Sequence, residues 1–526
     1  MDREINLDSI RALDKQIEEH EKAIIHLKRT RNSLLNVSTL LPPEILGNIF
    51  RWNVIPDGDF GGLSEDSYSF LLVCHHWFEV ASRTPELWCF WGNTIQDWSK
   101  RHSRRGYASL DLVVSSVGRS APELDEPLRD ALQDRAARGV IRRVHVRGVD
   151  EKIIEPIISS IITPGDGVLS NGVESFMLRN AGYHAVDVSR FFIRYNLPKL
   201  RRLNLSGMCR ISSWDSLKSH TAVLTNLSLK IEDSPIPTLS QLLSFLSSNP
   251  NLQHLVLSGS AVPHADDNAS SLQVPLRHLN KLHITSDFCR AFRLLNRLEL
   301  PDKMDSLRLL LYECSSSDLS QTLGPYFGDR VRRRGRFPGG GLELLANRDP
   351  GSIRLCVGDV YRNCDSAELD WFADVSAVTS TRLKDEEADE LCFDLIAHIP
   401  RDQVISLRTT LPILRSEESC VEMCDLTYLH LVDVNLTRWS VEPDIRGPHT
   451  SKEILPSLDH ITITRPTVSG GNWDPFVDFL SRRAAFGNRI SSLKLSGYLD
   501  MDENVVEGIK RVVKAFQGEG NDEDGS

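Results

Sequence analysis

The sequence contains residues that could do chemistry, but their spacing does not form a catalytic or metal-binding constellation. Cys420 and Cys424 are four residues apart with His430 downstream, whereas a structural zinc site needs a second pair of ligands. Asp59-Phe60-Gly61 matches the metal-holding triplet of protein kinases, without the glycine-rich and catalytic loops of those enzymes. Gly339-Gly340-Gly341 lacks the strand-to-helix context of a phosphate cradle. We therefore expect no enzyme activity, no cofactor and no metal.

The densest charge is a run of arginines within residues 328–344. The glycines and proline that follow predict a long basic loop. Guanidinium groups pair bidentately with carboxylates and phosphates, so this loop could dock an acidic or phosphorylated target. It could equally be a nuclear import signal or a solvated run without a partner. The arginines are Arg330, Arg332, Arg333, Arg334 and Arg336.

Bulk composition narrows the class of protein. The chain has 526 residues, 40% of them hydrophobic, which is enough for more than one domain or a repeat array. The net charge of −11 argues against a nucleic-acid binder. No apolar run approaches the length of a membrane span, and no signal peptide follows Asp2. Ten cysteines without a C-x-x-C pair fit reduced thiols, so we expect a cytoplasmic or nuclear protein.

Residues 7–35 predict one amphipathic helix with a heptad seam. Its apolar positions are Ile10, Leu13, Ile17, Ile24, Leu27 and Leu34, with His20 and Arg31 interrupting them. Two interpretations stay open. The helix either self-associates as a short coiled coil or braces its own domain.

The stretch LPPEILGNIF, residues 41–50, predicts a second helix that starts near Pro43. Residues 57–67 have the composition of an exposed loop. A further apolar segment then runs to Trp88, with a new turn at Pro85. Two or three short helices with so many large apolar side chains indicate a partner surface, because a unit of this size buries little of its own surface.

From about residue 140 onward, the pattern L-x-x-L-x-L recurs at steps of 24 to 32 residues. Each copy predicts a short strand with leucines facing inward, and helical segments such as 236–250 lie between copies. This periodicity predicts an α/β fold, an irregular leucine-rich-repeat solenoid of strand-helix units. The anchor residues are Val144, Phe176, Leu203, Leu227, Leu255, Leu282, Leu307, Leu429, Ile461 and Leu493.

The L-x-x-L-x-L pattern is interrupted over residues 315–400, where 352–357 predicts one degenerate strand. Residues 503–516 predict a helix that covers the last repeat, and 517–526 predict a disordered acidic tail. The expected organisation is an N-terminal helix (1–38), a small all-α domain (39–98), the repeat domain (99–516) and the tail (517–526).

The all-α segment resembles the F-box, because it contains the characteristic elements of that motif in the same order: Leu-Pro-x-Glu-Ile, then Val-Cys-x-x-Trp, then Pro-x-Leu-Trp. The long 57–67 loop and Leu72, where Ser often stands, depart from that pattern. With a heptad helix before it and leucine-rich repeats after it, the chain resembles F-box proteins of mushroom-type fungi. The residues that the resemblance assigns to adaptor binding are Leu41, Pro42, Ile45, Leu46, Ile49, Phe50, Val73, Cys74, Trp77, Leu87 and Trp88.

The resemblance implies a substrate receptor of a Skp–cullin–F-box ubiquitin ligase, which binds the Skp adaptor through the F-box and a target protein through the repeats. The alternative is a repeat scaffold without a ubiquitin link, whose first helices merely cap the array. Target contacts are expected at strand positions facing away from the leucines, besides Arg332, Arg333 and Arg334. These strand positions are Arg202, Asn204, Asn226, Ser228, His254, Val256, His283, Arg308, His430, Asp433 and Lys494.

Overall fold

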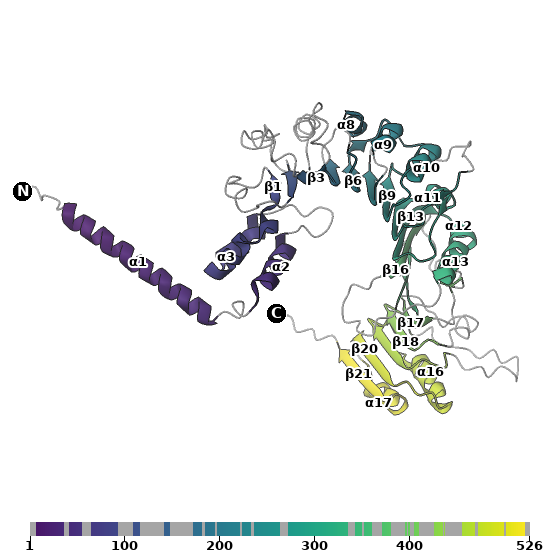
Figure 1. Cartoon of the computed structure of the whole chain (residues 1–526). Helices are drawn as coiled ribbons and strands as arrows, with labels where there is room; N and C mark the ends of the chain where they lie inside the picture. The colour runs from purple at the N-terminus through teal and green to yellow at the C-terminus, as the bar shows by residue number, and fades with distance from the viewer. Residues whose placement is uncertain are drawn as a thin grey trace, which may run out of the picture. The chain divides into compact units, whose positions relative to one another are not determined.

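The chain forms two compact units of mixed α/β structure (Figure 1). Unit 1 comprises residues 1–224 and 233–235, and unit 2 comprises residues 225–232 and 236–526. The computed structural model describes residues 7–35, 41–54, 65–92, 109–115, 141–147, 172–180, 185–194, 197–220, 223–232, 236–263, 272–334, 342–349, 352–359, 371–379, 395–396, 398–399, 404–409, 425–434, 436, 455–468, 472–498 and 501–520.

Unit 1 begins with helices and continues as parallel strands. Strands β1, β2, β3, β4 and β6 pair in that order, each parallel to the next, and β5 pairs with β7 separately. Its elements are α1 (Leu7–Leu35), α2 (Pro43–Val54), the 3-10 helix η2 (Glu65–Leu72), α3 (His75–Ser82), the 3-10 helix η3 (Pro85–Trp88), β1 (Phe90–Gly92), β2 (Leu110–Ser115), β3 (Ile141–Arg147), β4 (Ser175–Asn180), β5 (Val186–Asp187), α8 (Ser189–Arg194), β6 (Arg202–Gly207), β7 (Cys209–Arg210) and α9 (Trp214–His220).

The first part of unit 2 is a parallel stack in the order β8, β9, β11, β13 and β16. Helices α10 and α11 lie along one side of these strands (Figure 1). The elements are β8 (Asn226–Ile231), α10 (Leu239–Ser247), β9 (His254–Gly259), β10 (Val274–Pro275), β11 (Lys281–Asp287), α11 (Phe288–Leu295), β12 (Leu298–Glu299), β13 (Ser306–Cys314), α12 (Ser316–Asp318), the π-helix η5 (Leu319–Leu323), α13 (Gly324–Arg334) and β16 (Trp371–Thr379).

The second part of unit 2 is another parallel stack, β14, β17, β18, β19, β20 and β21. Strand β15 joins the two stacks, because it pairs antiparallel with both β14 and β16. The elements are β14 (Leu342–Asp349), β15 (Ser352–Asp359), β17 (Val404–Thr409), β18 (Tyr428–Val432), β19 (His460–Thr464), α16 (Asp474–Ala485), β20 (Ser492–Tyr498), α17 (Glu503–Val512) and β21 (Ala515–Gly520).

The predicted anchors lie directly opposite one another in these ladders, which confirms the strand register read from the sequence. Val144 pairs with Phe176 and Phe176 with Leu203. In unit 2, Leu227, Leu255, Leu282 and Leu307 form one row, and Leu429, Ile461 and Leu493 form another. All ten anchors are buried, so every strand adds its leucines to a row shared with the next strand.

A left-handed residue lies at the end, or one residue from the end, of five of these strands, always four positions after the anchor. The side chain at this position decides how closely the neighbouring strand can approach. A Cβ on Gly207, for example, would lie 2.0 Å from the Asn180 carbonyl oxygen, so only glycine fits there. The five residues and their φ angles are Gly207 (76°), Gly259 (63°), Asp433 (54°), Arg465 (51°) and Gly497 (70°).

Helix α10 shows how the segments between strands form. Thr238 caps its N-terminus, and a capping box links the Thr238 side chain to the Gln241 backbone N–H and the Gln241 side chain to the Thr238 backbone. Asn249 and Pro250 follow the last turn, as the sequence predicts. The buried face consists of Leu239, Leu242, Leu243, Phe245 and Leu246.

Three sequence predictions about irregular segments were wrong. Residues 328–334 belong to α13 and not to a basic loop, because Phe327 and Val331 are buried and anchor the helix. Residues 515–520 form β21 instead of a helix end and a disordered tail, since they complete the hydrogen bonds of β20. Residues 65–67 belong to η2, while 55–64 lie outside the described residues. The strand predicted at 352–357 exists as β15, within an antiparallel pair.

Candidate interaction surfaces

The helices between residues 41 and 88 share a compact aromatic core. Phe50 of α2 stacks on Phe70 of η2 with ring centroids 4.4 Å apart, and Trp77 of α3 lies 5.1 Å from Phe50. Leu41, Leu71 and Trp77 pack against this core from its edge. The buried members are Leu46, Phe50, Phe70, Val80, Ala81, Leu87, Trp88 and Val113.

Polar contacts fix the angles between these helices. Cys74 caps α3, with its Sγ accepting from the Trp77 backbone N–H at 3.5 Å. The Trp88 indole Nε1–H donates to the Ala81 carbonyl oxygen at 2.8 Å, so the buried ring has its polar group satisfied. A Cβ on Gly47 would lie 3.2 Å from Thr84 Oγ1, so the missing side chain allows α2 to approach the turn before η3 closely.

Large apolar side chains remain exposed on the same helices. Ile45 and Ile49 are 47% and 42% exposed, and they share one face of α2 because they are four residues apart. Leu72 and Val73, which precede α3, are 89% and 50% exposed. Phe78 on α3 is 38% exposed. We call Ile45, Ile49, Leu72, Val73 and Phe78 the exposed apolar set.

The structure divides the predicted adaptor-binding residues into surface and interior. Pro42, Ile45, Ile49 and Val73 are exposed, and Leu41, Cys74 and Trp77 are half-buried. The remaining four lie in the core with at most 3% exposure: Leu46, Phe50, Leu87 and Trp88. Leu72 and Phe78 are exposed residues that the predicted site omitted.

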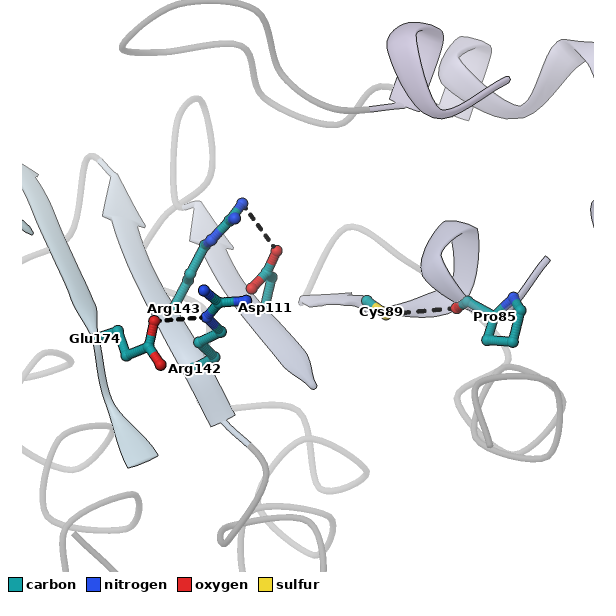
Figure 2. Close-up of polar contacts among 6 residues, drawn as sticks. All are labelled: Pro85, Cys89, Asp111, Arg142, Arg143 and Glu174. Atoms are coloured by element: carbon teal, nitrogen blue, oxygen red, sulfur yellow. Dashed lines mark hydrogen bonds and ion pairs between the residues drawn. The ribbon is translucent and has the colours of Figure 1, made fainter. Parts of the chain in front are cut away.

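The helical core continues directly into the first strands of unit 1 (Figure 2). Val113 of β2 belongs to the core cluster, and the Asp111 backbone N–H donates to the Cys89 carbonyl oxygen at 2.8 Å. The Cys89 thiol donates to the Pro85 carbonyl oxygen at 3.4 Å (Figure 2). No loop of the chain therefore separates the last helical turn, η3, from the strand β1 that follows it.

Charged pairs tie the next strands together. Figure 2 shows Arg143 reaching Asp111 at 3.4 Å and Arg142 reaching Glu174 at 2.7 Å. Burial raises the pKa of Asp111 to about 6, although Arg143 and Arg142 act to lower it. Above that pH, the buried Asp111 carboxylate is ionised at a cost in stability, which its ion pair with Arg143 partly offsets.

Several predicted target-binding residues form columns on the strand faces opposite the leucines. In unit 2, Ser228, Val256, His283 and Arg308 lie opposite one another on four adjacent strands. Asn226 lies opposite His254. All of these residues are half-buried or exposed, and all but Ser228, whose hydroxyl oxygen is buried, are within reach of a partner.

In unit 1, Arg202 is exposed but Asn204 was wrongly predicted to face solvent. Asn204 is only 8% exposed, and its Oδ1 has no hydrogen bond within the described part of the chain. The pairing of β4 with β6 sets Met177 beside Asn204, so a bulky neighbour covers part of the short amide.

A second column runs along β17 to β20 as Arg408, His430, Thr462 and Lys494. His430 Nε2 lies 3.1 Å from Thr464 Oγ1, and burial together with the nearby Arg408 lowers the pKa of His430 to about 4. Next to it, the rings of Tyr428 and His460 stack with centroids 4.7 Å apart. Asp433 lies at the left-handed position and not on the strand.

The arginine run lies on helix α13. Arg330 stacks over the Tyr326 ring at 5.5 Å and donates to the Leu300 carbonyl oxygen at 3.1 Å, so it serves the fold. Arg333 pairs with Asp329 at 2.8 Å, and Arg332 is exposed. Arg334 ends the helix, and Arg336 lies outside the described residues.

Metal sites and membrane-spanning helices are absent from the described residues. These residues contain no group of His, Cys, Asp and Glu that could hold a metal, and no helix long and apolar enough to cross a bilayer. Cys420 and Cys424 lie outside this part of the chain. Burial raises the pKa of Cys209 and of Cys314 to about 12, so both thiols are unreactive at neutral pH.

No protein-family model matches the sequence, and no curated protein matches it significantly.

Proposed function

We propose that this protein is a substrate-recognition subunit of a Skp–cullin–F-box ubiquitin ligase. The observation that carries the proposal is the exposed apolar set, which lies on a helical segment whose other large apolar side chains, among the described residues, are buried in one core or packed against it. The exposed parts of side chains such as Ile45 and Ile49 contribute nothing to the stability of the fold. Several large apolar side chains exposed on one small segment favour a protein contact. The adaptor would cover this surface.

The helical core has a separate task in this proposal. Leu46, Phe50, Leu87 and Trp88 hold α2, α3 and η3 in place, so that the exposed side chains keep a fixed arrangement. Because these side chains are already fixed, less conformational entropy is lost when the partner binds.

The target would bind the strand faces of the irregular leucine-rich-repeat solenoid. The columns through His283 and Arg308 and through His430 and Lys494 offer polar side chains at regular spacing on successive strands. The contribution of the receptor to ubiquitin transfer is proximity, because it holds target lysines near a charged enzyme.

One observation favours a second candidate, a repeat scaffold without a ubiquitin link. Val113 belongs to the helical core, and β1 follows η3 directly, which is how a terminal cap would join a strand array. A cap needs no exposed apolar surface, however, so the exposed apolar set argues for the receptor.

Adaptor binding tests the proposal. The full chain is titrated with a purified Skp adaptor, beside the variant Ile45→Asp/Ile49→Asp/Val73→Asp. We expect the wild-type chain to bind and this variant to lose binding while keeping its circular dichroism spectrum. The control variant His283→Asp/Arg308→Asp changes a strand face of unit 2, and it should bind the adaptor as the wild type does.

Two results would contradict the proposal. A folded wild-type chain that does not bind the adaptor leaves the scaffold as the better reading. A triple variant that binds with unchanged affinity would mean that the exposed apolar set is not the contact surface.

A further inference from the structure

Helix α1 carries an apolar seam that no other described part of the chain covers. Leu13, Ile17, Ile24 and Leu27 follow the heptad positions a and d, and each is between 50% and 67% exposed. Every side chain from residue 12 to residue 31 is exposed. Among the described residues, this exposure favours self-association over a helix that braces its own domain.

The length of α1 suits a coiled coil. Its 29 residues span about 43 Å and about four heptads. A helix in water needs an apolar partner for most of its stability, since propensity alone is marginal. In parallel coiled coils, Ile at positions a with Leu at positions d favours two strands over three or four.

A parallel pair would place like residues opposite one another. The heptad register then sets His20 against the partner's His20 and Arg31 against the partner's Arg31, so two guanidinium groups meet in one layer of the seam. The flanking positions add no ion pair, because Gln16 would face the partner's Glu21 and Ala23 the partner's Lys28.

An antiparallel pair removes both like-residue layers. With the a positions packed against the d positions of the second helix, polar residues meet apolar ones. The layers of the described residues are Ile17 with the partner's Leu27, His20 with the partner's Ile24, and Leu13 with the partner's Arg31.

The flanking charges also favour the antiparallel pair. Asp14 faces the partner's Lys28, and symmetry repeats this ion pair at the other end. Glu21 meets the partner's Glu21 near the centre, which is the one like-charge contact against two attractive pairs. The ion pair within the helix, Lys22 with Glu18 at 2.6 Å, uses outward positions and stays intact.

We propose that two copies of this chain associate through α1 as an antiparallel two-stranded coiled coil. The dimer does not depend on the ubiquitin-ligase proposal, because its surface is separate from the exposed apolar set of α2 and α3. Each dimer would carry two copies of every interaction surface of the chain.

Sedimentation equilibrium of the full chain tests the dimer. We expect the wild type to approach twice the chain mass of 59.2 kDa as its concentration rises. The variant Ile17→Asp/Leu27→Asp should stay monomeric over the same range. The control Ala12→Asp/Ile25→Asp introduces the same charges off the seam and should dimerise as the wild type does. A monomeric wild type, or a seam variant that dimerises normally, would overturn the proposal.

Charge reversal tests the orientation. Asp14→Lys alone, or Lys28→Asp alone, should weaken the dimer on the order of tenfold by placing like charges together. The double variant Asp14→Lys/Lys28→Asp restores both ion pairs and should recover the wild-type dissociation constant. Singles without effect, or a double variant that is not rescued, would contradict the antiparallel arrangement.

Discussion

Two adjacent residues of α2 allow binding and folding to be separated. Ile45 is 47% exposed and Leu46 is 1% exposed, although both are aliphatic and carry the same number of side-chain atoms. If the exposed apolar set contacts the Skp adaptor, truncation of Ile45 acts on binding, whereas truncation of Leu46 acts on folding.

The burial of each side chain sets the magnitudes. Full burial of an isoleucine side chain stabilises by about 1.5–3 kcal/mol, so the exposed half of Ile45 offers a partner about 1 kcal/mol. Ile49 is exposed to a similar extent, and together Ile45→Ala/Ile49→Ala should cost about 2 kcal/mol of binding, or roughly 30-fold in dissociation constant. Leu46→Ala leaves a cavity and should destabilise the helical segment by about 2–5 kcal/mol.

Isothermal titration calorimetry with the adaptor measures the first effect. Hydrogen–deuterium exchange of the peptides covering residues 41–54 and 65–89 measures the second, because it reports local opening in a chain with two units. We expect Ile45→Ala/Ile49→Ala to weaken binding with unchanged exchange, and Leu46→Ala to accelerate exchange. Equal binding by the wild type and a well-protected Ile45→Ala/Ile49→Ala variant would refute the reasoning.

Three further predictions concern the strand arrays. Gly207→Ala should destabilise unit 1 by roughly 2–4 kcal/mol, through its positive φ and its contact with the Asn180 carbonyl, as measured by denaturant unfolding beside the exposed-site control Ser212→Ala. Arg483 is buried and donates to the carbonyl oxygens of Leu455 and Leu458; Arg483→Met should cost about 2–4 kcal/mol, seen as faster exchange of the 455–468 segment, and wild-type exchange would contradict this. His430 has its pKa lowered from 6.5 to about 4, so its stabilising contribution is complete above pH 6.5 and is lost as the pH falls toward 4; His430→Gln should flatten the fall in unfolding midpoint over that range, and an unchanged slope would show that other groups cause it.

The repeat register was predictable because leucines at alternate positions report a strand with one buried face. Val144, Phe176 and Leu203 were recognised from the sequence and pair directly in the structure. Strand β17 was missed: its anchor, Leu407, pairs with Leu429, but the segment carries only one leucine in the pattern. Thr409 stands opposite Leu431, where the pattern requires a second leucine, so the L-x-L signal is absent from this segment.

The helical segment shows a different limit. Ile45, Leu46, Ile49 and Phe50 form one wide apolar face on a helical wheel, but the core takes only Leu46 and Phe50. The half of such a face that is buried is the half against which Phe70 and Trp77 pack. The positions of these two rings are set by tertiary contacts, which helical periodicity does not report. Helical periodicity therefore identified the apolar face of α2 but did not tell its buried residues from its exposed ones.

Local composition misled the prediction for the arginine run and the C-terminal end. Arginine is a good helix former, but the glycines after residue 334 led to the prediction of a loop. Residues 515–520 contain two glycines and a glutamate, which disfavour strands. The open edge of β20 overrides that preference, because it supplies hydrogen bonds to any segment held beside it.

The equal spacing of β18, β19 and β20 has a mechanical consequence. Their anchors Leu429, Ile461 and Leu493 are 32 residues apart, and within the described residues the ladder of each strand runs to its neighbours in the array. Tension applied at the C-terminal end would therefore detach one strand-helix unit at a time. Loss of β20 and then of β19 would each release 32 residues, or roughly 110 Å of extended chain. Phe516 of β21, which pairs with Leu493, is only 23 residues beyond it, so a force–extension trace should begin with a shorter tooth followed by two even ones.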